Sequence, residues 1–280
     1  MASCETSNPL LLRGKSQIFR AIVLAAQRPG RGDPLAATYH VSHKCLIPLA
    51  GRPLIAHVLE TLARHPHIDE IVVSIERGME DVISEIVGGL GADCPIRCTA
   101  SARNIADSVL EAASGHDGPL LITTADNALL QPDGISALLA SLRSGSDVSI
   151  AMAPKKAVLA AHADGQRRFY RFADDEYSNC NLYGIAGPYA LAAAEIFRTG
   201  GQFAKKMWRV IDSFGLLNLI LLRFRMVSLS DGLERVSNRV GLTIAPVILS
   251  DGRQAIDVDN ERTYAVVEEI LLAGSYAAKA

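Results

Sequence analysis

The chain has 280 residues, and 49% of them are hydrophobic, which is enough to bury a large core in one α/β domain. A formal net charge of −2 and a pI of about 6.4 give no overall attraction to nucleic acid or to an anionic membrane, so any basic site must be local. Five cysteines form an odd set without a paired Cys-x-x-Cys framework, which predicts reduced thiols in a cytoplasm.

The amino-terminal segment, residues 1–17, is expected to be a tail. Its apolar stretch at residues 10–12 is too short for a secretory signal, and Arg13 and Lys15 follow it. No apolar run approaches the roughly 20 residues of a membrane span. We therefore expect a cytoplasmic protein with a single domain at 18–280, in which residues 200–238 form a helical insertion.

The first half of the chain alternates strands with helices. Apolar runs predict strands at 19–25, 68–75, 95–99, 119–124 and 147–153. Apolar residues at helical spacing predict helices at 53–63, 79–90, 104–113 and 132–142. Strands that alternate with helices at this spacing predict a parallel sheet with right-handed crossovers.

The second half is less regular. Strands are predicted at 167–173, 181–186 and 242–249, with an acidic turn at 174–176, and helices at 188–197, 203–224, 231–236 and 261–272. Along 203–224 the apolar residues recur every three or four positions, which predicts an amphipathic helix. Three roles stay open for this helix: a cover over an acceptor site, a homodimer face, or a peripheral membrane contact through its lysines and arginines.

The turn after the first strand has the composition of a phosphate-binding loop. Residues 27–34 are rich in Gly, Arg and Pro, and glycines let backbone N–H groups converge on an anion. Arg28, Arg31 and Lys44 add positive charge to it. No Gly-Lys-Ser/Thr follows at Walker spacing, and the turn does not match Gly-x-Gly-x-x-Gly, so neither of these nucleotide-binding motifs applies.

Two stretches resemble the signature of sugar-nucleotide pyrophosphorylases and their relatives. Leu24-Ala-Ala26 resembles the opening Leu-Ala-Ala-Gly-x-Gly-x-Arg, and Lys44-Cys-Leu-Ile-Pro-Leu-Ala-Gly-Arg-Pro-Leu54 resembles Pro-Lys-x-Leu-x-x-Val-x-Gly-x-Pro-Leu. The departures are Gln27 in place of Gly, a rearranged turn, and His43 in place of the Pro before the lysine. Among NTP transferases, the chain looks most like the molybdenum-cofactor-guanylyltransferase-like branch.

This resemblance implies a fold and a set of site residues. The fold would be a Rossmann-like, mostly parallel α/β sheet with helices on both faces, as in nucleotide-diphospho-sugar (GT-A-like) transferases. Lys44 and Arg31 would be catalytic, with Arg28 competing for the place of the signature arginine. The implied nucleotide contacts are Leu24, Ala25, Ala26, Gln27, Arg28, Gly30, Ser101, Asn104 and Ser108. Each of the last three fits a helix cap or a surface hydroxyl or amide equally well.

Two acidic positions are candidates for a magnesium site. Asp126 follows the strand at 119–124, and ligands of open α/β sheets bind at the carboxyl ends of strands. The resemblance implies a magnesium-binding aspartate there and a second at Asp259, with Asp257 as a further candidate. Mg²⁺ takes one or two carboxylates together with phosphates and water. The alternative for Asp257 and Asp259 is a cap for the helix near residue 261.

Together these features predict a magnesium-dependent nucleotidyltransferase that joins an NTP to a small phosphorylated acceptor and releases pyrophosphate. The resemblance favours CTP or GTP. Two other classes stay open. Asp257-Val-Asp259 resembles the Asp-x-Asp metal motif of glycosyltransferases, and the rearranged turn with Gln27 would suit a non-catalytic nucleotide sensor.

Overall fold

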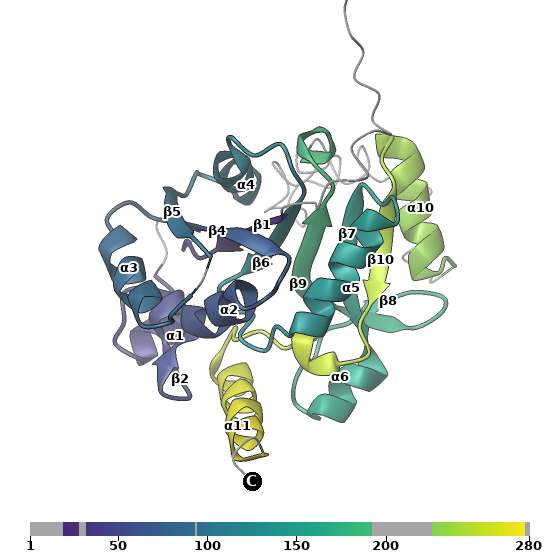
Figure 1. The fold of residues 1–280 in the computed structure, drawn as a ribbon. Helices are drawn as coiled ribbons and strands as arrows, with labels where there is room; N and C mark the ends of the chain where they lie inside the picture. The colour runs from purple at the N-terminus through teal and green to yellow at the C-terminus, as the bar shows by residue number, and fades with distance from the viewer. Residues whose placement is uncertain (1–18, 28–31, 93, 192–225, 278–280) are drawn as a thin grey trace, which may run out of the picture.

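The structure is a computed structural model that describes residues 19–27, 32–92, 94–191 and 226–277 (Figure 1). Within these ranges eight strands form one sheet, in the order β10-β7-β9-β6-β1-β4-β5 with β8 paired to β9. Their bounds are β1 (Phe19–Leu24), β4 (Ile68–Ile75), β5 (Ile96–Ala100), β6 (Leu120–Thr124), β7 (Val148–Pro154), β8 (Tyr170–Arg171), β9 (Glu176–Ile185) and β10 (Ile244–Ile248). All pairs are parallel except those that involve β9.

Helices cover both faces of this sheet. Alternate residues of β1 point to opposite sides, because Ala21 and Val23 join the larger core cluster whereas Ile22 joins a second one. The larger cluster packs α2 (Leu54–Ala63), α3 (Glu80–Gly88), α5 (Pro132–Arg143) and α11 (Glu261–Ala277), and the second packs α4 (Ile105–Ala113). The predicted fold class, a mostly parallel sheet with helices on both faces, is confirmed.

The predictions for the second half needed the most correction. The strand expected at 167–173 is only the two residues of β8, and the strand expected at 181–186 begins at Glu176, inside the expected acidic turn. The helix expected at 231–236 is α10 (Leu229–Val240), which packs against β10. Of the helix expected at 188–197, the described residues form a 3-10 turn, η3 (Pro188–Leu191), and residues 192–197 lie outside the described ranges.

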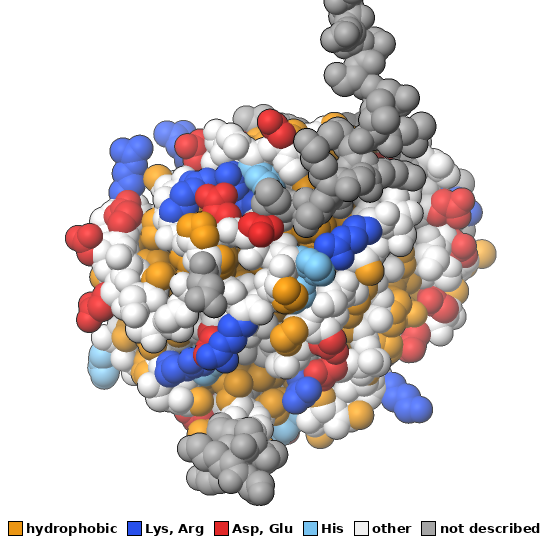
Figure 2. Space-filling model, in the orientation of Figure 1, with side chains coloured by type: hydrophobic (Ala, Val, Ile, Leu, Met, Phe, Trp, Pro, Cys, Tyr) orange, Lys and Arg blue, Asp and Glu red, His pale blue; other side chains and the backbone are white. Residues whose placement is uncertain are grey.

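Several predictions concern residues outside the described ranges. They include the amphipathic helix at 203–224, with its dimer or membrane roles, and the whole of the tail at 1–17. The single domain and the cytoplasmic location stay predictions. None of the helices in the described ranges is long and apolar enough to cross a bilayer. Figure 2 shows Lys and Arg side chains interspersed with Asp and Glu on the drawn face, in agreement with the formal net charge of −2.

Short elements that the sequence did not reveal shape the carboxyl edge of the sheet. They are α1 (Pro34–Thr38), η2 (Lys44–Leu46), β2 (Pro48–Leu49), β3 (Arg52–Pro53), α6 (Lys155–Ala161) and η5 (Gly252–Ala255). Element η5 packs closely on α6, because a Cβ at Gly252 would lie 2.2 Å from the carbonyl carbon of Ala157. Only glycine fits at position 252, because any side chain would overlap the backbone of α6. Element η5 connects β10 to the segment that contains Asp257.

The β2–β3 hairpin fixes the segment that follows Lys44. Ala50 and Gly51 both have positive φ, 47° and 81°, as a tight two-residue hairpin turn requires. His57 of α2 lies with Nε2 2.9 Å from the Leu49 carbonyl oxygen and Nδ1 3.1 Å from Arg52 Nη2. A neutral ring with its proton on Nε2 satisfies both contacts, since it donates to Leu49 and accepts from Arg52.

Acidification should therefore weaken the fold through His57. Burial lowers the pKa of His57, outweighing the hydrogen bond to Leu49 that raises it, and the charge of Arg52 lowers it further. Because the folded-state pKa lies below the unfolded one, the stabilisation present above about pH 6.5 is lost as the pH falls through the folded value. In urea titrations, a His57→Gln variant should lose less unfolding free energy between neutral and acidic pH than the wild type. Equal losses in the two proteins would contradict this assignment.

Candidate active site

The site lies where β1 and β6 end side by side. Leu24 pairs with Thr124 in the parallel ladder, and Ala125 N donates to the Leu24 carbonyl oxygen at 3.0 Å. Asp126 follows at once, so its carboxylate lies at the carboxyl edge of the sheet, as the sequence predicted. The first helical residue after it is Pro132 with Gln131 as the cap position, so Asp126 does not cap α5.

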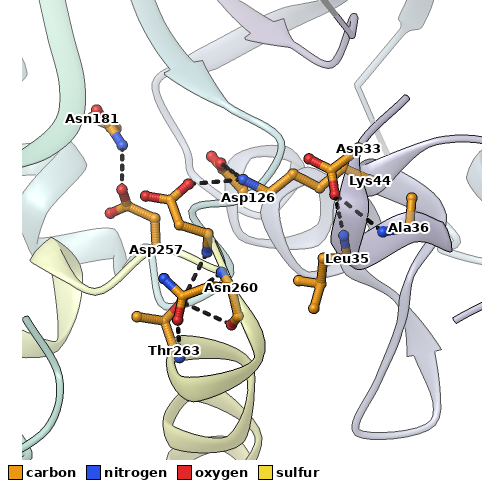
Figure 3. A network of polar contacts seen from close by, with 10 residues as sticks. Asp33, Leu35, Ala36, Lys44, Asp126, Asn181, Asp257, Asn260 and Thr263 are labelled. Carbon is orange, nitrogen blue, oxygen red and sulfur yellow. Dashed lines mark hydrogen bonds and ion pairs between the residues drawn. The ribbon is translucent and has the colours of Figure 1, made fainter. Parts of the chain in front are cut away.

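Lys44 reaches this edge from η2 and contacts two aspartates (Figure 3). Its Nζ donates to Asp126 Oδ2 at 2.5 Å and to Asp259 Oδ1 at 2.9 Å, across 82 and 215 positions of the chain. Val258 N donates to the Asp126 carbonyl oxygen at 3.2 Å and holds the 257–259 segment beside Asp126. The structure thus brings together three residues that the sequence singled out from distant positions.

Charge, rather than solvent, keeps this lysine protonated. Burial alone lowers the pKa of Lys44, but the negative charges of Asp126 and Asp259, with the hydrogen bonds they accept, raise it above its ordinary value. The side chains of Lys44 and Asp126 are only 21% and 18% exposed, whereas that of Asp259 is 58% exposed. At neutral pH the site therefore presents one ammonium between two carboxylates, and Asp259 is the more open to solvent.

Asp257 has a different environment from Asp259. Its Oδ2 accepts from Asn181 Nδ2 of β9 at 2.8 Å, and its Oδ1 is buried without a hydrogen-bond partner (Figure 3). Burial and then the charges of Asp126 and Asp259 raise the pKa of Asp257 well above its usual value, against the opposing effects of Lys44 and Asn181. The two aspartates of Asp257-Val-Asp259 thus contact different partners.

The helix-capping alternative for these aspartates is wrong. Asn260 Oδ1 accepts from Thr263 N at 3.2 Å, and Thr263 Oγ1 accepts from the backbone N–H groups of Asp259 and Asn260 at 2.9 and 3.1 Å. Asn260 and Thr263 therefore satisfy the start of α11. Helix capping therefore does not occupy the carboxylates of Asp257 and Asp259.

Buried polar atoms without hydrogen-bond partners gather at this same edge. Within the described ranges such side-chain atoms are Ser74 Oγ, Thr124 Oγ1, Asp126 Oδ1, Asn127 Oδ1 and Asp257 Oδ1, together with Glu76 Oε2, which lies 3.3 Å from His43 Nε2 without a hydrogen bond. All of them belong to residues at the carboxyl ends of β4 and β6 or to Asp257, which lies beside Asp126. Because buried polar atoms are normally hydrogen-bonded, their concentration here marks a place that a polar ligand would satisfy.

The residues present fit a magnesium ion. Among the described residues, no group of three or more His, Cys, Asp or Glu side chains is arranged as a metal site. Magnesium does not need one, because it is usually held by one or two carboxylates, substrate phosphates and waters. Asp126 supplies a buried oxygen without a partner, and Asp259 supplies an exposed carboxylate across Lys44 from it.

The predicted nucleotide contacts divide into three groups. Leu24, Ala25, Ala26 and Gln27 lie at the end of β1, beside Asp126, whereas Arg28, Gly30 and Arg31 fall outside the described residues. Asn104 is the cap of α4, since its Oδ1 accepts from Asp107 N at 2.9 Å, and Ser108 Oγ accepts from Ala102 N at 2.9 Å. Ser101 N donates to the Ile75 carbonyl oxygen at 2.8 Å. The nucleotide contacts themselves stay predictions.

These features define an α/β protein with a polar site at the carboxyl edge of the parallel strands β1 and β6. The chain belongs to the MobA-like NTP transferase family, whose model matches residues 21–205. The resemblance stated from the sequence is confirmed.

Individual relatives support the same assignment. The chain is 30% identical over 186 residues to the bifunctional enzyme IspD/IspF of Rhizorhabdus wittichii, covering 66% of this chain and 44% of that protein. It is 24% identical over 233 residues to a 2-C-methyl-D-erythritol 4-phosphate cytidylyltransferase of Pelotomaculum thermopropionicum, covering 82% and 93%. This chain thus spans less than half of the Rhizorhabdus protein.

A solved structure supports the fold. The similar structure is described as a hypothetical transferase from Thermus thermophilus, with a TM-score of 0.71, 19% identity, and coverage of 88% of this chain and 99% of that one. At this identity the likeness concerns the fold alone.

Proposed function

We propose that this chain is a magnesium-dependent nucleotidyltransferase for a small phosphorylated acceptor. An oxygen of the acceptor phosphate would attack the α-phosphorus of an NTP, the bond from the α-phosphorus to the bridging oxygen would break, and pyrophosphate would leave. The observation that carries this proposal is the meeting of Lys44, Asp126 and Asp259 at a sheet edge rich in unpartnered polar atoms.

Each residue has a distinct role in this proposal. Lys44 binds the phosphates and stabilises the negative charge that develops on the departing pyrophosphate. Asp126 and Asp259 hold the magnesium ion, which when bound neutralises charge on the triphosphate. Nucleotidyl transfer needs positioning and charge stabilisation rather than a covalent nucleophile, and the site offers both.

The nucleotide and the acceptor are proposed by analogy. The Pelotomaculum relative is named as a cytidylyltransferase of a phosphorylated polyol, which favours CTP and a sugar-like or polyol phosphate here. GTP is the second choice, because the signature resembles the molybdenum-cofactor branch.

A pyrophosphate-release assay tests the proposal. The purified chain is mixed with each of the four common triphosphates, each of three acceptors (a sugar phosphate, an inositol phosphate and phosphocholine), and either Mg²⁺ or EDTA. We expect release only with Mg²⁺, an acceptor, and CTP or GTP. In a parallel mixture of the chain with a nucleotide sugar and the same acceptors, release of a nucleoside diphosphate would instead identify a glycosyltransferase. Nucleotide binding without turnover in any mixture would identify a sensor.

A further inference from the structure

Two positions where the chain departs from the signature it resembles meet at one carboxylate. Gln27 stands in place of Gly and His43 in place of Pro. The backbone N–H of Gln27 donates to Glu76 Oε1 at 2.6 Å, and His43 Nε2 lies 3.3 Å from Glu76 Oε2. Glu76 directly follows β4, the strand next to β1 in the sheet. Gln27 and His43 therefore both contact the carboxylate of Glu76, at the end of the neighbouring strand.

The side chain of Gln27 extends this connection in two further directions. Its Nε2 donates to the Ser42 carbonyl oxygen at 2.5 Å, and its Oε1 accepts from Asp33 N at 3.2 Å. Asp33 in turn caps α1, with Oδ1 accepting from Leu35 N and Ala36 N at 2.9 and 3.0 Å. One amide group thus ties the end of β1 to the start of α1 and to the residue two positions before Lys44.

The segment before Lys44 cannot take its position from a proline. His43 has φ −135° and ψ 145°, whereas a proline ring holds φ near −65°. Ser42 and His43 lead directly into η2, where Leu46 N donates to the His43 carbonyl oxygen at 3.0 Å and Ile47 N to that of Lys44 at 3.1 Å. In this chain hydrogen bonds, and not a proline ring, hold the backbone of Ser42 and His43 in front of Lys44.

We propose that Gln27, together with Glu76, is a positioning residue for Lys44. The pair fixes Ser42 and His43, and so sets where the backbone of Lys44 begins and how its Nζ reaches Asp126. A glycine at position 27 would keep only the backbone bond to Glu76, because the other two bonds come from the side-chain amide. The catalytic consequence rests on the proposed function of Lys44, but the positioning itself does not.

The experiment compares Gln27→Ala with a matched control, Gln131→Ala. Gln131 is also a loop glutamine whose Nε2 donates to a backbone carbonyl oxygen, that of Leu129 at 3.2 Å, but it does not hold the Lys44 segment. Two readouts are taken: steady-state pyrophosphate release with kcat and KM determined separately, and hydrogen–deuterium exchange of the peptide that contains the amides of Leu46 and Ile47.

We expect Gln27→Ala to lower kcat by about 10- to 100-fold with little change in the KM for the acceptor, as a misplaced catalytic group does. The Leu46 and Ile47 amides should exchange faster, and Gln131→Ala should match the wild type in both readouts. Wild-type exchange in Gln27→Ala would overturn the proposal, as would faster exchange with unchanged kcat. If the wild type releases no pyrophosphate with any acceptor, the proposed function fails, and the exchange comparison still decides whether Gln27 positions this segment.

Discussion

Lys44→Ala is expected to lower kcat for pyrophosphate release by about 100- to 1,000-fold, the usual cost of removing one preorganised donor from a developing anion. The same change should lower the thermal midpoint at neutral pH, because Asp126 and Asp259 then face each other without the ammonium that both contact. Kinetics and thermal melts on the same preparation measure both effects.

The control for Lys44→Ala is Arg97→Ala. Arg97 is also an ion-paired cation, with Nε 2.7 Å from Glu70 Oε1, but both residues lie toward the amino ends of their strands, away from the site. This variant should keep wild-type kcat. A Lys44→Ala protein that releases pyrophosphate at the wild-type rate would refute the role given to this lysine.

Asp126→Asn is expected to lower kcat on the order of 1,000-fold, because it replaces the carboxylate proposed to hold magnesium with a neutral amide of the same shape. The same change removes one ion-pair partner of Lys44, but it also removes one of the charges that, after burial, raise the pKa of Asp257. Because Asp259 still pairs with Lys44, we expect a smaller loss of thermal midpoint than in Lys44→Ala. Direct titration of Mn²⁺ in the presence of nucleotide should show weaker binding than in the wild type.

Asp147→Asn is the matched control for this change. Asp147 directly precedes β7, at the amino-terminal ends of the strands and away from the site. Its carboxylate accepts hydrogen bonds from Tyr189 Oη at 2.6 Å and from Thr243 N at 2.8 Å. It should retain both turnover and Mn²⁺ binding. Full activity in a folded Asp126→Asn protein would remove the metal assignment.

The sequence predicted the parallel strands well, because a strand buried on both faces is a continuous apolar run. Strand β4 has the bounds that were predicted, and β6 differs by one residue. Only the second half of β9 was predicted, and its first half was missed for a physical reason. Asn179 and Asn181 interrupt its apolar pattern, and Asn181 has φ 48° at an irregularity in the pairing with β7. A polar, bulged strand cannot be recognised from alternation alone.

The site was predicted in part for similar reasons. The position of Asp126 follows from the end of an apolar strand, so its location was predictable. The bond between Asp257 and Asn181 depends on β9 lying antiparallel between β6 and β7, an order that the pattern of residues does not reveal. The hydrogen bonds of Gln27 join it to Ser42 and Glu76, which lie 15 and 49 positions away in the sequence. The sequence alone does not predict such contacts, because they depend on how the folded chain places these residues.

The lysine between two aspartates has a consequence for ligand entry. Without nucleotide, the Nζ of Lys44 acts as an internal counter-ion and occupies lone pairs of Asp126 Oδ2 and Asp259 Oδ1. A divalent cation that arrives alone must compete with this tethered ammonium for the same oxygens. Under the proposed function a triphosphate would give the ammonium another anion to bind, so we expect nucleotide and metal to bind cooperatively.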